Sequence, residues 1–247
     1  MKLKTLLAAS LLTCFASAAS AHDRWLLPSH SNVSNDKGEW IMVDVSASNH
    51  AFYADKPLGA ESLRIITPSK KSTYPSSSYR GHRKSVVDVH LEQSGTYRLE
   101  MRGDARYWTT FTLDGEKDWR RGNKLDNQGK LPKGATDIES AVSYSTVQTY
   151  ITLNNPTDNF ELSNQGLELM PVTHPSDVAQ GETAKFKMMF NGKPQAKVKV
   201  EVVREGARYR NDPEVLELVS DKQGLISFTP VDAGRYLLMA RYSESIK

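Results

Sequence analysis

The chain has 247 residues, a single cysteine, and 32 lysine and arginine against 29 aspartate and glutamate residues, a net charge of +3 with histidine neutral. Charges this nearly balanced provide no extended basic surface, so a nucleic-acid partner is not expected. The basic run EKDWRRGNK (116–124) has acids interleaved with it and is interpreted as a solvated loop.

The first 21 residues have the three parts of a secretory signal peptide. MKLK is a short positive segment, TLLAASLLTCF is apolar, and Ala19-Ser20-Ala21 is a small-x-small cleavage site. The apolar run is about half the roughly 20 residues that a membrane span needs, and no later segment approaches that length. We therefore expect a periplasmic protein that begins at His22 and is not inserted in the membrane after cleavage.

Two other interpretations of this segment stay open. One is lipidation at Cys14, although LLTC lacks the small residue that normally precedes a lipidated cysteine. The other is cleavage after Ala18, which would leave Ala19 as the first residue and remove the terminal histidine.

The mature chain is expected to contain two domains held by hydrophobic cores. Cys14 leaves with the signal peptide, so no disulfide is possible. Loss of Lys2 and Lys4 lowers the basic count to 30, which leaves a net charge of about +1. A mature length of about 226 residues allows one large domain or two ordinary ones, and we favour two.

In chain order, the sequence shows short stretches of alternating apolar residues separated by turn residues, which predict β-strands. In the N-terminal half these are EWIMVDVSAS (39–48), SVVDVHLEQ (85–93) and YWTTFTL (107–113). In the C-terminal half, AKFKMMF, NGKP and AKVKVEVV (184–203) predict a hairpin, because Asn191-Gly192 can adopt the positive φ angles of a tight turn. EVLELVS, LISFTPV and RYLLMARY continue the pattern up to residue 242.

A short sequence pattern that occurs twice supports two similar domains. LEQSGTYRLEM (91–101) and TPVDAGRYLLMA (229–240) share a polar turn, a glycine, one residue, a tyrosine and an apolar run. In immunoglobulin-like sandwiches a tyrosine after such a turn fixes the corner through its hydroxyl group. Tyr97 and Tyr236 are therefore predicted to be structural and to occupy equivalent positions.

The predicted fold class is all-β, with two immunoglobulin-like β-sandwich domains and an irregular connecting segment. After the signal peptide (1–21), the N-terminal sandwich is expected at 22–113 and the C-terminal sandwich at 167–247. Residues 114–166 are rich in Asn, Asp, Gly, Lys and Pro as far as YSTVQTYITL (144–153), a stretch that is compatible with another strand. The whole segment is expected to link and brace the two sandwiches.

Several stretches together resemble a known family. They are AHDRWLLPS after the signal peptide, VDVSASN followed by FYAD, DVHL and QSGTYRL, GLELMPVTHPSDVAQGETAKFKMMFNGKP, and ARYRND. The chain resembles the periplasmic family catalogued as domain of unknown function 4198, similar to proteins found beside nickel, cobalt and iron uptake systems. The resemblance implies a β-rich periplasmic protein linked to transition-metal uptake. The position of His50 in SNHAF is more often an acid in the family pattern, so this sequence departs from it there.

A terminal His22 would have a metal-binding chemistry that an internal histidine lacks. Its α-amine and ring Nδ1 can chelate one ion, and a further imidazole would complete a three-nitrogen site suited to Cu(II) or Ni(II). His174, His50 and His90 are the preferred candidates for that third ligand, and His30 is a further one. His82 lies among positive charges that disfavour a cation.

No catalytic motif is recognisable, and we predict that the protein is not an enzyme: there is no phosphate loop, G-x-S-x-G elbow or H-E-x-x-H helix. The scattered carboxylates, such as Asp88, Glu161 and Glu182, show no pairing for acid–base chemistry. Trp40 and Trp108 lie in strand patterns typical of packing, and Trp119 is the least constrained tryptophan.

Three functions remain. The preferred one is a non-catalytic periplasmic protein that handles a divalent transition metal (Cu, Ni, Co or Fe) and assists a membrane metal transporter or receptor. The second is a copper oxidoreductase that uses the N-terminal histidine chelate. The third is a structural or carbohydrate-binding double sandwich in which the histidines are incidental.

Overall fold

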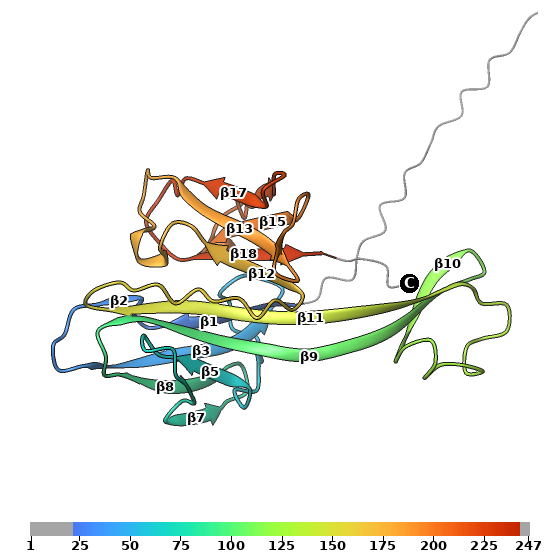
Figure 1. Cartoon of the computed structure of the whole chain (residues 1–247), viewed down its shortest axis with the longest axis horizontal. Coiled ribbons are helices and arrows are strands. Elements are labelled where there is room, and N and C mark those ends of the chain that lie inside the picture. Colours follow the sequence, from blue (N-terminus) through green and yellow to red (C-terminus); the bar gives the residue numbers. More distant parts are fainter. Residues whose placement is uncertain (1–21, 243–247) are drawn as a thin grey trace, which may run out of the picture.

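The computed structural model describes residues 22–242, and the predicted signal peptide (1–21) lies outside them. These residues form two β-sandwiches, one stacked on the other, and a long hairpin that projects to one side (Figure 1). Two three-residue 3-10 turns, η1 (Pro175–Asp177) and η2 (Ala207–Tyr209), are the only helical elements of the described part. The all-β prediction is therefore confirmed, and no helix of residues 22–242 has the length and hydropathy to cross a membrane.

The N-terminal sandwich consists of a five-stranded and a six-stranded sheet. The first has the order β1 (Asp23–Pro28), β3 (Glu39–Ser48), β8 (Ser85–Leu91), β7 (Ser77–Arg80), with β4 (Lys56–Pro57) on β3. The second has the order β2 (Asn32–Val33), β11 (Thr136–Leu153), β9 (Gly95–Leu113), β5 (Leu63–Ile66), β6 (Ser72–Thr73), with β10 (Glu116–Arg121) on β9.

The core between these sheets comes from the alternation that predicted the strands. Ile41, Val43 and Val45 of β3 are completely buried, while Trp40 and Met42, which alternate with them, are exposed. Successive side chains of a strand point to opposite faces, so every second residue enters the core. Leu99 of β9 and Ile151 of β11 close it from the other sheet.

The expected division into 22–113 and an irregular segment 114–166 needs correction. Residues 136–153 form β11, which pairs antiparallel with β9 from Leu153 opposite Gly95 to Thr136 opposite Thr112. This strand is part of the N-terminal sandwich. Its second half, YSTVQTYITL (144–153), has the pattern that the sequence analysis interpreted as a further strand. Residues 136–143 and the pairing with β9 were not predicted, because Ser and Thr occupy many positions of β11 and its partner lies about 40 residues earlier, where no local pattern shows it.

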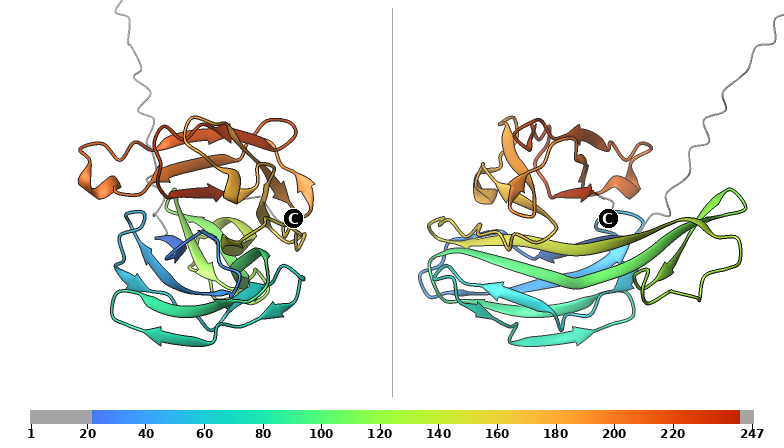
Figure 2. Two further views of the ribbon diagram at one scale, coloured as in Figure 1. Left: turned by 90° about the vertical axis from the view of Figure 1, so that its left-hand side faces the viewer. Right: turned by 45° about the vertical axis from the view of Figure 1, so that its right-hand side comes forward.

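The C-terminal half of β9, the N-terminal half of β11 and β10 form an arm that extends beyond the sandwich (Figures 1 and 2). Its tip is ordered by buried Asn127, whose side-chain amide donates to Thr109 Oγ1 and to the carbonyls of Arg121, Gly122 and Asn123. Phe111 of β9, in the same arm, is also buried. The tip is therefore held together by specific hydrogen bonds. Residues 116–124 were predicted to form a solvated loop: residues 116–121 are exposed, but they form β10, paired with β9, and not a loop.

The C-terminal sandwich begins with β12 (Leu167–Pro171). One sheet has the order β12, β13 (Ala184–Phe190), β14 (Lys193–Pro194), with β17 (Leu225–Phe228) on β13, and the other has β16 (Leu216–Val219), β15 (Lys199–Arg204), β18 (Tyr236–Arg241). The predicted hairpin at Asn191-Gly192 is present, and both residues have positive φ angles. The core contains Phe186, Met188 and Phe228.

The hydroxyl groups of both predicted corner tyrosines form hydrogen bonds with the backbone four or five residues upstream. The Tyr97 hydroxyl accepts hydrogen bonds from the N–H groups of Gln93 (2.7 Å) and Glu92 (3.0 Å). The Tyr236 hydroxyl donates to the carbonyl of Asp232 (2.7 Å). The hydroxyl group of each tyrosine thus fixes the turn at the start of its own strand, as the repeated sequence pattern predicted.

Residues 154–166 connect the two sandwiches and lie against the outer face of β9. Arg98 donates to the carbonyl of Glu161 (2.7 Å), and Arg102 Nη1 lies 2.8 Å from buried Glu168 of β12. Burial raises the pKa of Glu168, but hydrogen bonds from Ser163 and Arg102 outweigh it and hold the pKa below its ordinary value. The bracing role expected for the whole of 114–166 belongs to this shorter stretch.

Candidate metal-binding site

His22 lies immediately before β1 and is half-buried. The next residue, Asp23, stands opposite Ser48 at the end of β3. His50 follows two residues later in the turn that leaves β3, and its N–H donates to Ser48 Oγ (3.2 Å). Antiparallel pairing of β1 and β3 therefore brings the start of the predicted mature chain and His50 to the same end of the sheet.

The charged and titratable groups that act on Asp23 include both of these histidines. The pKa of the Asp23 carboxyl group is raised, chiefly by burial and also by Glu201. The positive charge of Arg241 and the nearby His22 and His50 oppose this shift. Arg241 Nη2 lies 3.9 Å from Asp23 Oδ1. Both histidines and two residues of the C-terminal sandwich thus lie within electrostatic reach of one carboxylate.

The donors at this end of β1 are two imidazoles, one carboxylate and, after cleavage at the predicted site, an α-amine. Nitrogen with some oxygen is the donor set that Cu(II) and Ni(II) favour. Among the residues that the structure describes, no three His, Cys, Asp or Glu side chains gather closely enough to hold a metal ion. The donor types fit a metal, and the α-amine is the ligand that would have to complete the set.

His174 does not lie at this site. Its Nδ1 accepts from the backbone N–H of Ser176 (3.1 Å), so the neutral ring carries its proton on Nε2, 3.0 Å from Thr96 Oγ1. Asn32 contacts the same turn, beyond the far end of β1. Since six extended residues span about 20 Å, His174 is too distant to be the third ligand of His22. It caps η1 instead.

His90 is also elsewhere, on the outer face of the first sheet. Its ring stacks on Trp40 with centroids 4.4 Å apart, and its Nδ1 lies 3.1 Å from Glu92 Oε1. It does not share a location with His22. Of the four histidines predicted to bind metal, the fold brings together His22 and His50.

Sequence reasoning did not name Asp23 as part of this site. Its only sequence signal is its place directly after His22, since nothing local shows that β1 pairs with β3 or that Arg241 approaches from the second sandwich.

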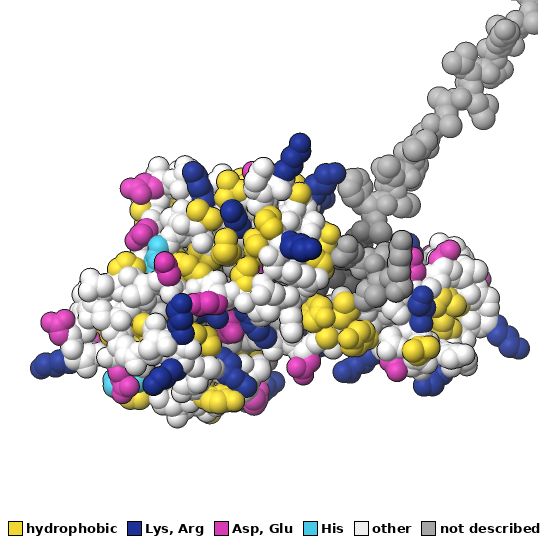
Figure 3. Space-filling view, in the orientation of Figure 1, with side chains coloured by type: hydrophobic (Ala, Val, Ile, Leu, Met, Phe, Trp, Pro, Cys, Tyr) yellow, Lys and Arg dark blue, Asp and Glu magenta, His cyan; other side chains and the backbone are white. Residues whose placement is uncertain are grey.

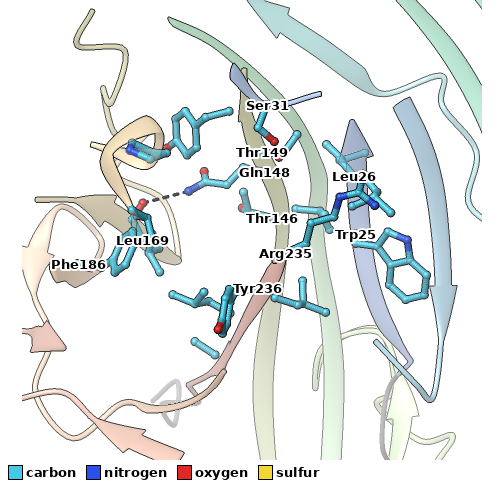
Figure 4. Close-up of a pocket in the computed structure, with 18 of the residues that line it drawn as sticks. Trp25, Leu26, Ser31, Thr146, Gln148, Thr149, Leu169, Phe186, Arg235 and Tyr236 are labelled. Carbon is cyan, nitrogen blue, oxygen red and sulfur yellow. Dashed lines mark hydrogen bonds between the residues drawn. The ribbon is translucent and has the colours of Figure 1, made fainter. Parts of the chain in front are cut away.

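A cavity of about 480 Å³ lies between the two sandwiches (Figure 4). Its N-terminal wall comes from β1 and β11, and its C-terminal wall comes from β12, β18 and the C-terminal core. Gln148 of β11 donates to the carbonyl of Leu169 across it (3.1 Å). The sequence did not predict this cavity.

On the face shown in Figure 3, basic and acidic side chains are intermingled, and apolar side chains gather on the C-terminal sandwich. On the arm, Trp119 is 62% exposed and meets Trp108 edge-to-face at 4.9 Å.

The fold therefore defines a double β-sandwich protein with a projecting hairpin arm. Residues 19–244 match the family described as "Domain of unknown function (DUF4198)", and the chain belongs to that family. No curated protein matches it.

Among solved structures, the chain is similar to Escherichia coli alpha-2-macroglobulin activated by porcine elastase, with 10% identity and a TM-score of 0.23. The alignment covers 92% of this chain and 30% of that one. A likeness this low carries no argument about fold or function.

Proposed function

We propose that the protein is a periplasmic, non-catalytic transition-metal-handling protein that assists a membrane metal transporter or receptor. The metal is held by the α-amine and imidazole of His22 together with the imidazole of His50. The observation that carries this proposal is the pairing of β1 with β3: Asp23 stands opposite Ser48, so His22, the residue before it, lies at the same end of the sheet as His50. The Asp23 carboxylate contributes negative charge that favours a divalent cation.

The site is built at the end of a paired strand, which suits a chelate that requires a defined terminus. β1 is anchored on β3 along its length, and Trp25 is buried against Phe52 three residues after His22. The terminal residue is therefore held near His50 at little additional entropic cost, which favours binding through preorganisation.

The decisive experiment compares two mature proteins, one that begins at His22 and one that carries a single extra N-terminal residue. Both keep every side chain, but only the first has the amine–imidazole chelate. Calorimetric titration with Cu(II) and Ni(II) should show a loss of at least tenfold in affinity in the extended protein. Equal affinities would refute the chelate, and mass spectrometry of the secreted protein would establish the terminus.

Histidine variants separate this site from nonspecific binding. His50→Ala should weaken binding at the same site, whereas His90→Ala, on the outer face with Trp40, should leave the affinity unchanged. Equal losses in both variants would indicate scattered surface binding and would contradict the proposal.

A further inference from the structure

Two stretches that stand out in the sequence, FYAD (52–55) and ARYRND (207–212), belong to different sandwiches and meet in the fold. The first follows the turn after β3, and the second lies between β15 and β16. The guanidinium carbon of Arg208 lies 3.9 Å from the centroid of the Tyr53 ring. Neither stretch contains a residue of the histidine site.

A second cavity, of about 360 Å³, lies where the two stretches meet. This volume is at the lower end of the range for ligand pockets, roughly 300–1,000 Å³, so it suits a small molecule. One part of the lining is apolar and consists of Leu27, Ala51 and Phe52. The other part carries charges and aromatic rings, and it includes Tyr53, Glu205, Arg208, Tyr209 and Arg235.

Positive charge prevails in this cavity. Arg235 is engaged by Glu205, whose carboxylate accepts from the backbone N–H of Arg235 (3.1 Å) and lies 3.5 Å from its Nη1. Among residues 22–242, no carboxylate forms an ion pair with Arg208 or with Arg83, which stands 5.1 Å from the Tyr53 ring centroid. Arg208 and then Arg83 lower the pKa of the Tyr53 hydroxyl group below its ordinary value.

The turn that carries Arg208 is fixed by its own sequence. Ala207, the first residue of η2, is buried. Arg210 Nη1 donates to the carbonyl of Glu205 (2.8 Å), and its Nη2 donates to the carbonyl of Arg204 (3.2 Å). The turn is therefore held in place before a ligand arrives, which lowers the entropic cost of binding.

The facing stretch has a strained backbone. Phe52 has a φ angle of +61°, a conformation that is costly for a bulky side chain. Its ring packs edge-on against buried Trp25, with centroids 5.9 Å apart, and Arg83 Nε donates to the carbonyl of Ala54 (3.0 Å). Strain of this kind persists where the surroundings enforce it and is concentrated at ligand sites, and here it accompanies the placement of Tyr53 in the cavity lining.

We propose that this cavity binds a small organic anion, a molecule with a carboxylate group and an apolar body. Stacking on the Tyr53 ring uses the face of the Arg208 guanidinium group and leaves N–H groups at its edge for the carboxylate. The apolar body lies against Leu27 and Phe52. An inorganic anion would satisfy the arginine alone and leave the apolar lining without a partner. This site is separate from metal binding at His22.

The test uses benzoate as the probe and its neutral analogue benzamide as the matched control ligand. Each is titrated calorimetrically into the mature protein, and inorganic phosphate is titrated in parallel. Benzoate should bind saturably and at least tenfold more tightly than benzamide or phosphate, and in NMR spectra it should shift the Arg208 Nε–H resonance. No saturable binding of benzoate, or equal binding of benzamide, would overturn the proposal. Phosphate that binds as tightly as benzoate would refute the organic body of the ligand.

Two variants locate the binding. Arg208→Gln removes the guanidinium group from an exposed position and should lower benzoate affinity at least tenfold without changing the Tm. Arg121→Gln makes the same change on exposed strand β10 and should leave the affinity unchanged. Equal losses in the two variants would indicate nonspecific attraction and contradict the proposal.

Cu(II) titration of the same variants keeps this site distinct from the proposed metal site. Arg208→Gln leaves His22 and His50 in place, so its Cu(II) affinity should equal that of the wild type. A loss of Cu(II) affinity together with benzoate affinity would show that the change reaches His50, and would refute a separate anion site.

Discussion

Replacing Tyr97 with phenylalanine removes one hydroxyl group that accepts two backbone hydrogen bonds in the folded protein, from Glu92 and Gln93. The ring itself is 2% exposed and would keep its packing in the core. The two N–H groups would lose their acceptor, and an unsatisfied buried donor costs about 1–3 kcal/mol. Since Glu92 and Gln93 lie in an exposed turn that water can reach, we expect a total loss of about 2 kcal/mol.

Tyr236→Phe is the matched control because it makes the same change at the equivalent corner of the second sandwich. Tyr236 makes one hydrogen bond, to the carbonyl of Asp232, and is only half-buried. Its removal should cost about 1 kcal/mol, the net value of an ordinary hydrogen bond.

Urea denaturation and differential scanning calorimetry of both variants would test this difference. For a chain of this size, about 2 kcal/mol corresponds to a fall in Tm of roughly 4–8 °C, and about 1 kcal/mol to roughly 2–4 °C. Equal shifts in the two variants, or a negligible shift for Tyr97→Phe, would show that the hydroxyl hydrogen bonds do not stabilise the corner.

Three further changes test other parts of the fold. Glu168→Gln breaks the buried pair with Arg102 and should cost about 3 kcal/mol at neutral pH. Because the folded-state pKa of Glu168 is lowered, this stabilisation exists above the ordinary glutamate pKa and is lost as pH falls through the folded value, so wild type and variant should converge in acid. Asn127→Ala should loosen the arm tip alone, seen as faster hydrogen exchange and proteolysis within 122–135 while the global Tm barely changes. Gly166→Ala would place a Cβ 2.8 Å from that of Tyr144 at a φ of +66°, and should destabilise by about 1–3 kcal/mol in chemical denaturation.

The class of fold and most of the core followed from local sequence. Alternation placed Ile41, Val43 and Val45 on one face, and a turn pair at Asn191-Gly192 predicted its hairpin correctly. The repeated glycine-x-tyrosine pattern also predicted two corner hydrogen bonds, which the structure contains. These features depend on residues close together in the chain, where backbone geometry and burial act at short range.

The extent of the first sandwich and the histidine that lies at the same end of the sheet as His22 were decided by tertiary structure alone. β11 pairs with a strand about 40 residues earlier, and β1 brings His22 toward His50 rather than His174. Each of these depends on which strands become neighbours. Strand pairing joins backbone groups that every residue carries, so sequence specifies it only through the packing of the complete fold.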